Sequence, residues 1–176
     1  MRADMTRVPK KVEQRIKAEL RKYQKILEAA RARDLNESDT AIIVSNMLAD
    51  IFGFDRFTDI TTEYSIRSTY CDLAVKTDDK IHFLIEVKAI GKDLRDVHLR
   101  QAVDYATKEG VDWVILTNAL EWEAYRVLFQ KPIEHEMVFE MNLLEVSPKS
   151  ADVVEKLYLL TKEGIKKSAI AAYHKE

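Results

Sequence analysis

Hydrophobic residues recur at steps of three and four near the start of the chain, which predicts an amphipathic helix. Pro9 comes just before this stretch and suits the first turn of a helix. The expected helix is about 20 residues long, and basic residues fill its other face. Its hydrophobic stripe either docks on the rest of the protein or pairs with a second copy of the chain. The stripe consists of Val12, Ile16, Leu20, Tyr23 and Leu27.

A second helix is expected to begin near residue 36 and to belong to the core. Asn36 or Ser38 can cap its N-terminus, and Gly53 can end it. Acidic residues stand in its first turn, where the helix dipole favours negative charge. Its hydrophobic face is wide, as expected of a helix that packs in the core. This face consists of Ile43, Met47, Leu48, Ile51 and Phe52.

Three strand candidates come next in the sequence. They are residues 57–66, 69–77 and 81–89. The last two are separated by a segment of hairpin-turn composition, residues 77–80. In the third candidate, alternation places Glu86 and Lys88 with Leu84 on one face, opposite a hydrophobic face.

The hairpin also predicts a pairing between two acidic residues. If it folds about Asp79, then Asp72 stands opposite Glu86, and directly opposed side chains lie about 5 Å apart. Two carboxylates at that distance repel each other unless a cation lies between them. A different turn type would shift the pairing by one residue.

The second half of the chain predicts a parallel crossover. A helix is expected from Asp93 or Asp96 to Glu109, and Gly110 can end it. Strands are expected at residues 113–117, 122–129 and 137–146, followed by a helical tail after Pro148. The strand–helix–strand order and the hydrophobic run at 113–117 favour an α/β fold with a sheet covered on both faces.

Composition is typical of a soluble globular protein. The 176 residues are 47% hydrophobic and 33% charged, which favours one domain with a proper core. No hydrophobic run approaches the roughly 20 residues that span a bilayer, and no export signal is evident. The single cysteine suits a reducing compartment, so we expect a cytoplasmic protein without a membrane partner.

Charge is unevenly distributed along the chain. Net charge is −2, but residues 1–33 hold eleven Lys or Arg against four Asp or Glu. This basic segment either supplies contacts to phosphates or is a solvated helix surface with excess lysine.

Asp72, Glu86 and Lys88 have a coherent joint use in phosphodiester hydrolysis. Hard cations such as Mg²⁺ prefer carboxylate oxygens and retain waters, so the two acids and the backbone carbonyl of Val87 could hold one. Such a metal activates water, and Lys88 could orient that water or neutralise charge that develops on the phosphate. The alternative is that the three charges form only a structural ion-pair cluster.

These residues resemble a nuclease family. The triplet Asp72…Glu86-Val87-Lys88 matches the PD-(D/E)xK pattern, and Gln101-x-x-x-Tyr105 matches the helix motif of its RecB-like branch. Residues 36–127 resemble the N-terminal nuclease domain of the R subunit of type I restriction enzymes. The quoted motifs keep that domain's order: Glu37-x-x-Thr40, Glu63-Tyr64, residues 85–89, and 116–118 before Trp122.

The resemblance implies a restriction-endonuclease-like α/β/α core with a mixed central sheet, a Mg²⁺ site in which Mn²⁺ can substitute, and DNA as substrate. It implies that Asp72 and Glu86 are catalytic metal ligands, that the Val87 carbonyl is a further ligand, and that Lys88 is catalytic. Gln101 and Tyr105 would support the site or contact DNA. The likeliest additional acid is Glu37, with Asp39 as its competitor. On this basis residues 1–33 form a basic helix, 34–147 the nuclease-like core and 148–176 helices packed on it, within one domain.

The chain departs from the family in two respects. Cys71 stands where a proline usually precedes the aspartate, at a position that does no chemistry. No Gly-x-x-x-x-Gly-Lys phosphate loop is present, so the ATP-driven motor of R subunits is not expected here. The hypothesis is therefore a Mg²⁺-dependent DNA endonuclease without a motor, with restriction-system or DNA-processing subunits, or a second copy, as partners. The alternative is a module that binds nucleic acid or a protein and cuts weakly or not at all.

Overall fold

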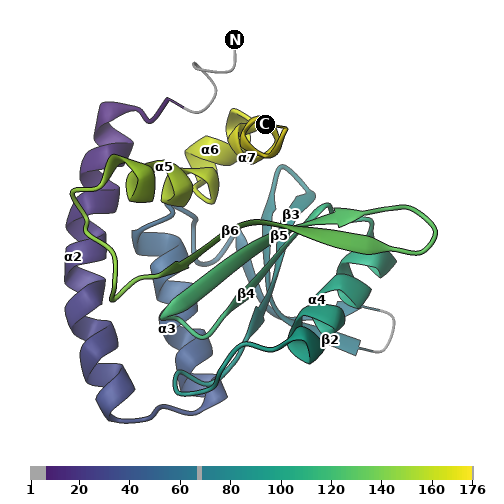
Figure 1. Ribbon diagram of the computed structural model, residues 1–176, viewed down its shortest axis with the longest axis horizontal. Helices are drawn as coiled ribbons and strands as arrows, with labels where there is room; N and C mark the ends of the chain where they lie inside the picture. Colours follow the sequence, from purple (N-terminus) through teal and green to yellow (C-terminus); the bar gives the residue numbers. More distant parts are fainter. Residues whose placement is uncertain (1–6, 67–68, 176) are drawn as a thin grey trace.

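The computed structural model describes residues 7–66 and 69–175, and in this part of the chain six strands form one sheet (Figure 1). The strands follow one another across the sheet in sequence order. They are β1 (Ile60–Ile66), β2 (Thr69–Thr77), β3 (Lys80–Val87), β4 (Trp113–Thr117), β5 (Glu121–Leu128) and β6 (Glu134–Asn142). The helices are α2 (Lys10–Ala32), α3 (Glu37–Asp50), α4 (Asp96–Glu109), α5 (Ala151–Leu159), α6 (Lys162–Lys166) and α7 (Ala169–His174).

The sheet is mixed and has helices on both faces. Strands β3 and β4 are parallel and joined by α4, whereas the other neighbouring strands are antiparallel. Helices α2, α3 and α5 pack on one face in the larger hydrophobic core, and α4 packs on the other face in the smaller one (Figure 1). The expected α/β fold with a mixed central sheet and a parallel crossover is confirmed.

Helix α2 docks on the rest of the chain through its hydrophobic stripe. Val12, Ile16, Leu20, Tyr23 and Leu27 are all buried in the larger core. The side chain of Gln24 donates hydrogen bonds to the carbonyls of Leu143 and Val146, at 2.8 and 2.9 Å. The stripe is therefore used within the chain, which is the first of the two expected arrangements.

The hairpin between β2 and β3 reaches the expected register by an unexpected route. Its loop has only two residues, Asp78 and Asp79, with φ of 51° and 61°, as the mirror-image hairpin turns require. The fold is therefore not centred on Asp79, and this turn alone would offset the strands by one residue. A bulge between Val75 and Lys76 restores the register, so that Leu73 pairs with Ile85.

Element boundaries differ from expectation where local contacts compete with the sheet. The strand expected at 137–146 runs instead from Glu134 to Asn142. Residues 143–146 leave the sheet because the carbonyls of Leu143 and Val146 accept bonds from Gln24 of α2 and Leu143 is fully buried. Strand β1 begins three residues later than expected, because Asp55 accepts bonds from the backbone N–H groups of Phe57 and Thr58 and folds this segment into a turn. None of the described helices is both long and hydrophobic enough to cross a membrane.

Candidate active site

The pairing of β2 with β3 ends beside Asp72, and the carboxylate of this residue continues the connection between the strands. The last paired residues are Leu73 and Ile85. Next to them, Oδ2 of Asp72 accepts a hydrogen bond of 2.8 Å from the backbone N–H of Val87. This bond holds the carboxylate against the end of β3. Asp72 comes just before Leu73 in β2, and Glu86 comes just after Ile85 in β3, so both acids lie one position beyond the last pair. The same register therefore brings the two acids together at one edge of the sheet.

Lys88 comes directly after β3 and lies between two acids. Its Nζ is 3.0 Å from Oε1 of Glu86 and 3.9 Å from Oε2 of Glu37. The side chains of Glu86 and Lys88 are 3% and 10% exposed, whereas that of Glu37 is 48% exposed. The buried pair is thus open to solvent on the Glu37 side. The predicted alternation of β3 is confirmed, since Phe83, Ile85 and Val87 are in the larger core and Leu84 is in the smaller one.

One oxygen of Glu86 is left without a hydrogen bond. The Oε2 atom is buried and has no partner among the described residues, and it is the one such side-chain atom found in them. A buried polar atom without a partner costs free energy, on the order of 1–3 kcal/mol and more when the group is charged. The Oε2 atom of Glu86 is therefore a buried acceptor whose hydrogen-bonding capacity is unused within the described residues.

The pKa values of Asp72 and Glu86 are both raised, which indicates that nearby positive charge does not balance the two carboxylates. Burial raises the pKa of Glu86 to about 7, and the neighbouring charge of Asp72 adds to this effect against the opposing bond from Lys88. Burial also raises the pKa of Asp72, with a further contribution from Glu37, although the N–H of Val87 and the charge of Lys88 oppose it. Burial alone would lower the pKa of Lys88, but the bond and charge of Glu86 raise it, so the ammonium stays protonated.

Two contacts at the start of α3 position Glu37 near Lys88. Asn36 caps the helix by accepting a bond of 2.8 Å from the N–H of Asp39, which selects the first of the two expected caps. Thr40 is fully buried, and its Oγ1 accepts a bond of 3.1 Å from the N–H of Ile90. This bond ties the helix start to the segment after Lys88. Of the two acids considered, Glu37 is the one that faces Lys88.

Asn118 ties the turn after β4 to the segment after Lys88, as Thr40 ties the start of α3 to it. Its Oδ1 accepts bonds from the N–H groups of Leu120 and Glu121 and so forms the turn after β4. Its Nδ2 donates to the carbonyl of Lys92 at 2.9 Å. The N–H of Lys88 bonds to the carbonyl of Thr117 at 2.9 Å. Thr40 and Asn118 were noted from the sequence only as parts of motifs, because the partners of both lie far away in the chain.

His98 was not predicted to belong to the site. It is buried in the first turn of α4, and its Nδ1 accepts a bond of 3.2 Å from the N–H of Arg95. Burial lowers the pKa of His98, and the charges of Lys88, Lys92 and Arg95 lower it further. The ring is therefore neutral near pH 7 and lies among cations. No sequence pattern singled out His98, since the four histidines show no ligand spacing.

Gln101 and Tyr105 lie on one face of α4, as their spacing predicted, and they bond to each other. The Nε2 atom of Gln101 donates to the Tyr105 hydroxyl at 2.8 Å. Tyr105 is buried in the smaller core, and Gln101 is exposed. In the described part of the chain no hydrogen bond joins either residue to Asp72, Glu86 or Lys88. Their predicted role in site support or DNA contact stays a prediction.

Cys71 is a packing residue in this arrangement. It is fully buried, and its Sγ donates to the carbonyls of Ile85 and Leu73 at 3.2 and 3.4 Å. Burial, with the charge of Glu86, raises the pKa of the thiol to about 12. A thiol that stays protonated at neutral pH is a poor nucleophile.

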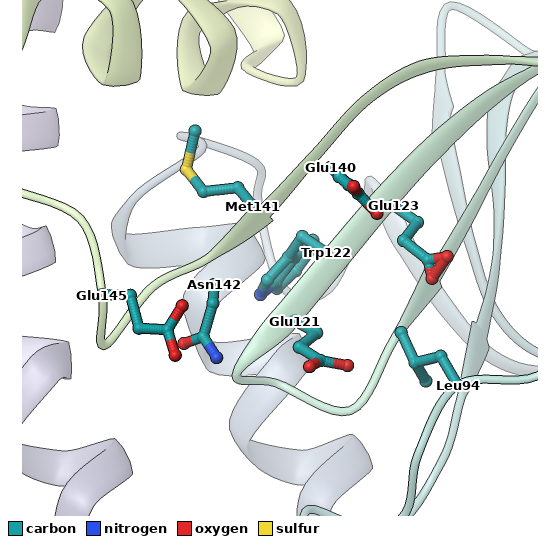
Figure 2. Close-up of a pocket in the computed structure, with 8 residues that line it drawn as sticks. All are labelled: Leu94, Glu121, Trp122, Glu123, Glu140, Met141, Asn142 and Glu145. Carbon is teal, nitrogen blue, oxygen red and sulfur yellow. The ribbon is translucent and has the colours of Figure 1, made fainter.

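A separate hollow on β5 and β6 is lined by acids (Figure 2). Its volume is about 420 Å³, and Figure 2 shows the carboxylates of Glu121, Glu123, Glu140 and Glu145 around the buried ring of Trp122. Burial raises the pKa of Glu121, as do the charges of Glu123 and other nearby acids. The four carboxylates give this hollow a negative potential.

Fold and geometry together define a restriction-endonuclease-like α/β protein. Its helices cover a mixed sheet, and an acid–acid–lysine cluster lies where β2 and β3 part. The type I restriction enzyme R protein N terminus is the family whose model matches, over residues 44–139, which is more than half of the chain. The chain belongs to this family, as the resemblance of its motifs implied. No curated protein and no solved structure matches it significantly.

Proposed function

We propose that the chain is a Mg²⁺-dependent deoxyribonuclease module that hydrolyses phosphodiester bonds in DNA, with Mn²⁺ as a substitute metal. The observation that carries the proposal is the buried, unpartnered Oε2 of Glu86 beside a second carboxylate, that of Asp72. Membership of the restriction-enzyme family supports DNA as the substrate and other restriction-system subunits as partners.

The residues fit a magnesium ion. Mg²⁺ is commonly held by one or two carboxylates with several waters and substrate phosphate oxygens. Asp72 and Glu86 supply two carboxylates, and the backbone carbonyl of Val87 is the third protein ligand proposed. No three His, Cys, Asp or Glu side chains in residues 7–66 and 69–175 cluster as a closed metal site. Glu37, which faces the ammonium of Lys88 at 3.9 Å, is the additional acid proposed at this site.

Each residue then has a separate task. The metal, when bound, activates water and polarises a phosphoryl oxygen. Asp72 and Glu86 would hold it at the edge of the sheet. Lys88 stays protonated beside Glu86 and neutralises charge that develops on the phosphate. Glu37 keeps the ammonium directed toward the open side of the site.

Cleavage of plasmid DNA with Mg²⁺ or Mn²⁺ tests the proposal. Wild type is compared with Asp72→Asn, which preserves the bond to Val87, and with Lys88→Ala. Asp79→Asn and Lys80→Ala serve as matched controls, since both residues are exposed in the hairpin turn or next to it. We expect the site variants to lose about 100-fold or more in rate and the controls to match wild type. Unchanged cleavage in both site variants would overturn the proposal, and binding without cleavage by wild type would favour the non-cutting module.

A further inference from the structure

A groove opens beside Asp72 between α3 and the strands β1 and β2. Its volume is about 490 Å³, within the range of sites that hold small organic groups. It is lined by Ser38, Ile42, Ser45 and Asn46 from α3, Thr62 from β1, and Asp72. We call this cavity the α3–β1 groove. Because Asp72 lines it, the groove is continuous with the proposed metal site.

The chemistry of the groove suits a neutral, hydrogen-bonding group. Hydroxyl and amide side chains provide donors and acceptors, and Ile42, which is 61% exposed, provides an apolar surface. Among the residues that line it there is no Lys or Arg, whereas Glu37 and Glu63 join Asp72 as acids. A phosphate would be repelled here. A nucleobase combines a flat apolar face with neutral polar edges, and so it matches this lining.

Two exposed cations lie in the segment before α4. Helix α3 packs in the larger core and α4 in the smaller one, so the starts of these helices approach the site from opposite faces (Figure 1). Lys92 and Arg95, both exposed, lie just before α4, close enough to His98 to lower its pKa together with Lys88. The segment before α4 therefore offers two cations, which alternate with Asp93 and Asp96, whereas the residues that line the groove include no cation.

The absence of cations from the groove lining, with Lys92 and Arg95 available before α4, suggests an orientation for the substrate strand. We propose that the α3–β1 groove receives the base of the nucleotide next to the scissile phosphate, while the sugar–phosphate backbone lies against Lys92 and Arg95. A base can enter the groove only when it is unstacked, so the chain prefers single-stranded or frayed DNA to a closed duplex. The inference rests on the proposed nuclease function and adds the mode of substrate binding.

An abasic scan tests where the base lies. Binding of a short single-stranded oligonucleotide is measured by fluorescence anisotropy in Ca²⁺, with one base removed at each position in turn. For wild type we expect one position at which loss of the base weakens binding about tenfold, the effect of losing one or two hydrogen bonds. No such position in wild type would overturn the inference.

Variants of the groove connect that position to the protein. Ser45→Tyr fills the groove and should weaken binding of the intact oligonucleotide about as much as loss of the base, without further loss on the abasic one. Asn46→Ala leaves the space open and should weaken binding about two- to tenfold through a lost polar contact. Thr107→Tyr, at an exposed position on α4, is the matched control and should bind as wild type does. Losses from Ser45→Tyr and from base removal that simply multiply would contradict the groove assignment.

Failure of the two proposals can be told apart. Cleavage and stabilisation of the protein by Mg²⁺ test the nuclease proposal, whereas oligonucleotide binding alone tests the role of the groove. Ser45→Tyr should keep the wild-type rise in melting temperature on addition of Mg²⁺, because Asp72 and Glu86 remain. A loss of that rise would show damage to the metal site, and Asn46→Ala then decides the assignment of the groove.

Discussion

Asp59 and Glu86 are both buried acids paired with a lysine, yet their surroundings have opposite consequences. Asp59 is 6% exposed and Glu86 is 3% exposed. The Oδ2 atom of Asp59 accepts bonds from Lys162 Nζ at 2.7 Å and from the N–H of Asp55 at 2.8 Å. Burial alone would raise the pKa of Asp59, but these bonds outweigh burial and lower it. Glu86 has Lys88 on one oxygen and no described partner on the other, and its pKa rises to about 7.

The difference separates a satisfied ion pair at Asp59 from an acid at Glu86 whose second oxygen has no described partner, as the proposed metal site requires. Asp59 fastens the loop before β1 to α6 and leaves nothing for another group to satisfy. Glu86 and Asp72 retain excess negative charge, which the fold keeps at a cost to stability. Sites that act on ligands often carry such a cost. The two acids therefore predict opposite responses to the same kind of substitution.

The largest difference is expected in DNA cleavage. Glu86→Gln should lower the cleavage rate by about 100-fold or more, because the amide cannot replace a metal-binding carboxylate. Asp59→Asn should cleave at nearly the wild-type rate, since Asp59 belongs to a structural pair away from the site. Both rates are measured on plasmid DNA in Mg²⁺. Equal losses in the two variants would erase the proposed distinction.

A smaller effect is expected for stability, and here Asp59 is the acid whose substitution matters. Asp59→Ala should lower the free energy of unfolding at pH 7 by about 1–3 kcal/mol, because a buried network loses its acceptor. Because the folded pKa of Asp59 lies below its ordinary 3.8, the carboxylate stabilises the fold at neutral pH, and this contribution disappears as pH falls through the folded pKa. Urea titrations at several pH values check both the magnitude and the direction.

The smallest effect concerns Asp72 in the absence of metal. Asp72→Asn keeps an acceptor for the N–H of Val87 but removes a charge that faces Glu86. At pH 8 the variant should be more stable than wild type by about 0.5–2 kcal/mol. The pKa of Glu86 is raised, so this advantage should shrink as pH falls below about 7 and Glu86 takes up a proton. Thermal unfolding in EDTA measures it, and a less stable variant at pH 8 would contradict the proposed repulsion.

The sequence predicted the site as far as local periodicity extends. Alternation along β3 placed Glu86 and Lys88 on one face, and the spacing of Gln101 and Tyr105 placed them on one face of α4. The register that brings Asp72 close to Glu86 was expected from a turn about Asp79, whereas the bulge at Val75 and Lys76 in fact sets this register. A bulge has no clear sequence signature, so the register could be expected but its cause could not.

Other features of the site depend on contacts between distant parts of the chain. Thr40 meets Ile90, and Asn118 meets Lys92, only after α3, β3 and β4 are packed. Burial lowers the pKa of His98, and the charges of Lys88, Lys92 and Arg95, which the fold brings near the ring, lower it further. The docking of α2 could likewise not be chosen from its hydrophobic stripe, because the same stripe would also suit pairing between two copies.

Calorimetric titration of the metal-free chain with Mn²⁺ at pH 7 tests the central claim most directly. If Asp72 and Glu86 form the metal site, wild type binds Mn²⁺ and releases a fraction of a proton, because Glu86, with its pKa of about 7, must ionise fully. The measured heat then depends on the ionisation enthalpy of the buffer. Asp59→Asn should bind as wild type does, and Asp72→Asn should bind much more weakly. No binding by wild type, or equal binding by Asp72→Asn, would contradict the account.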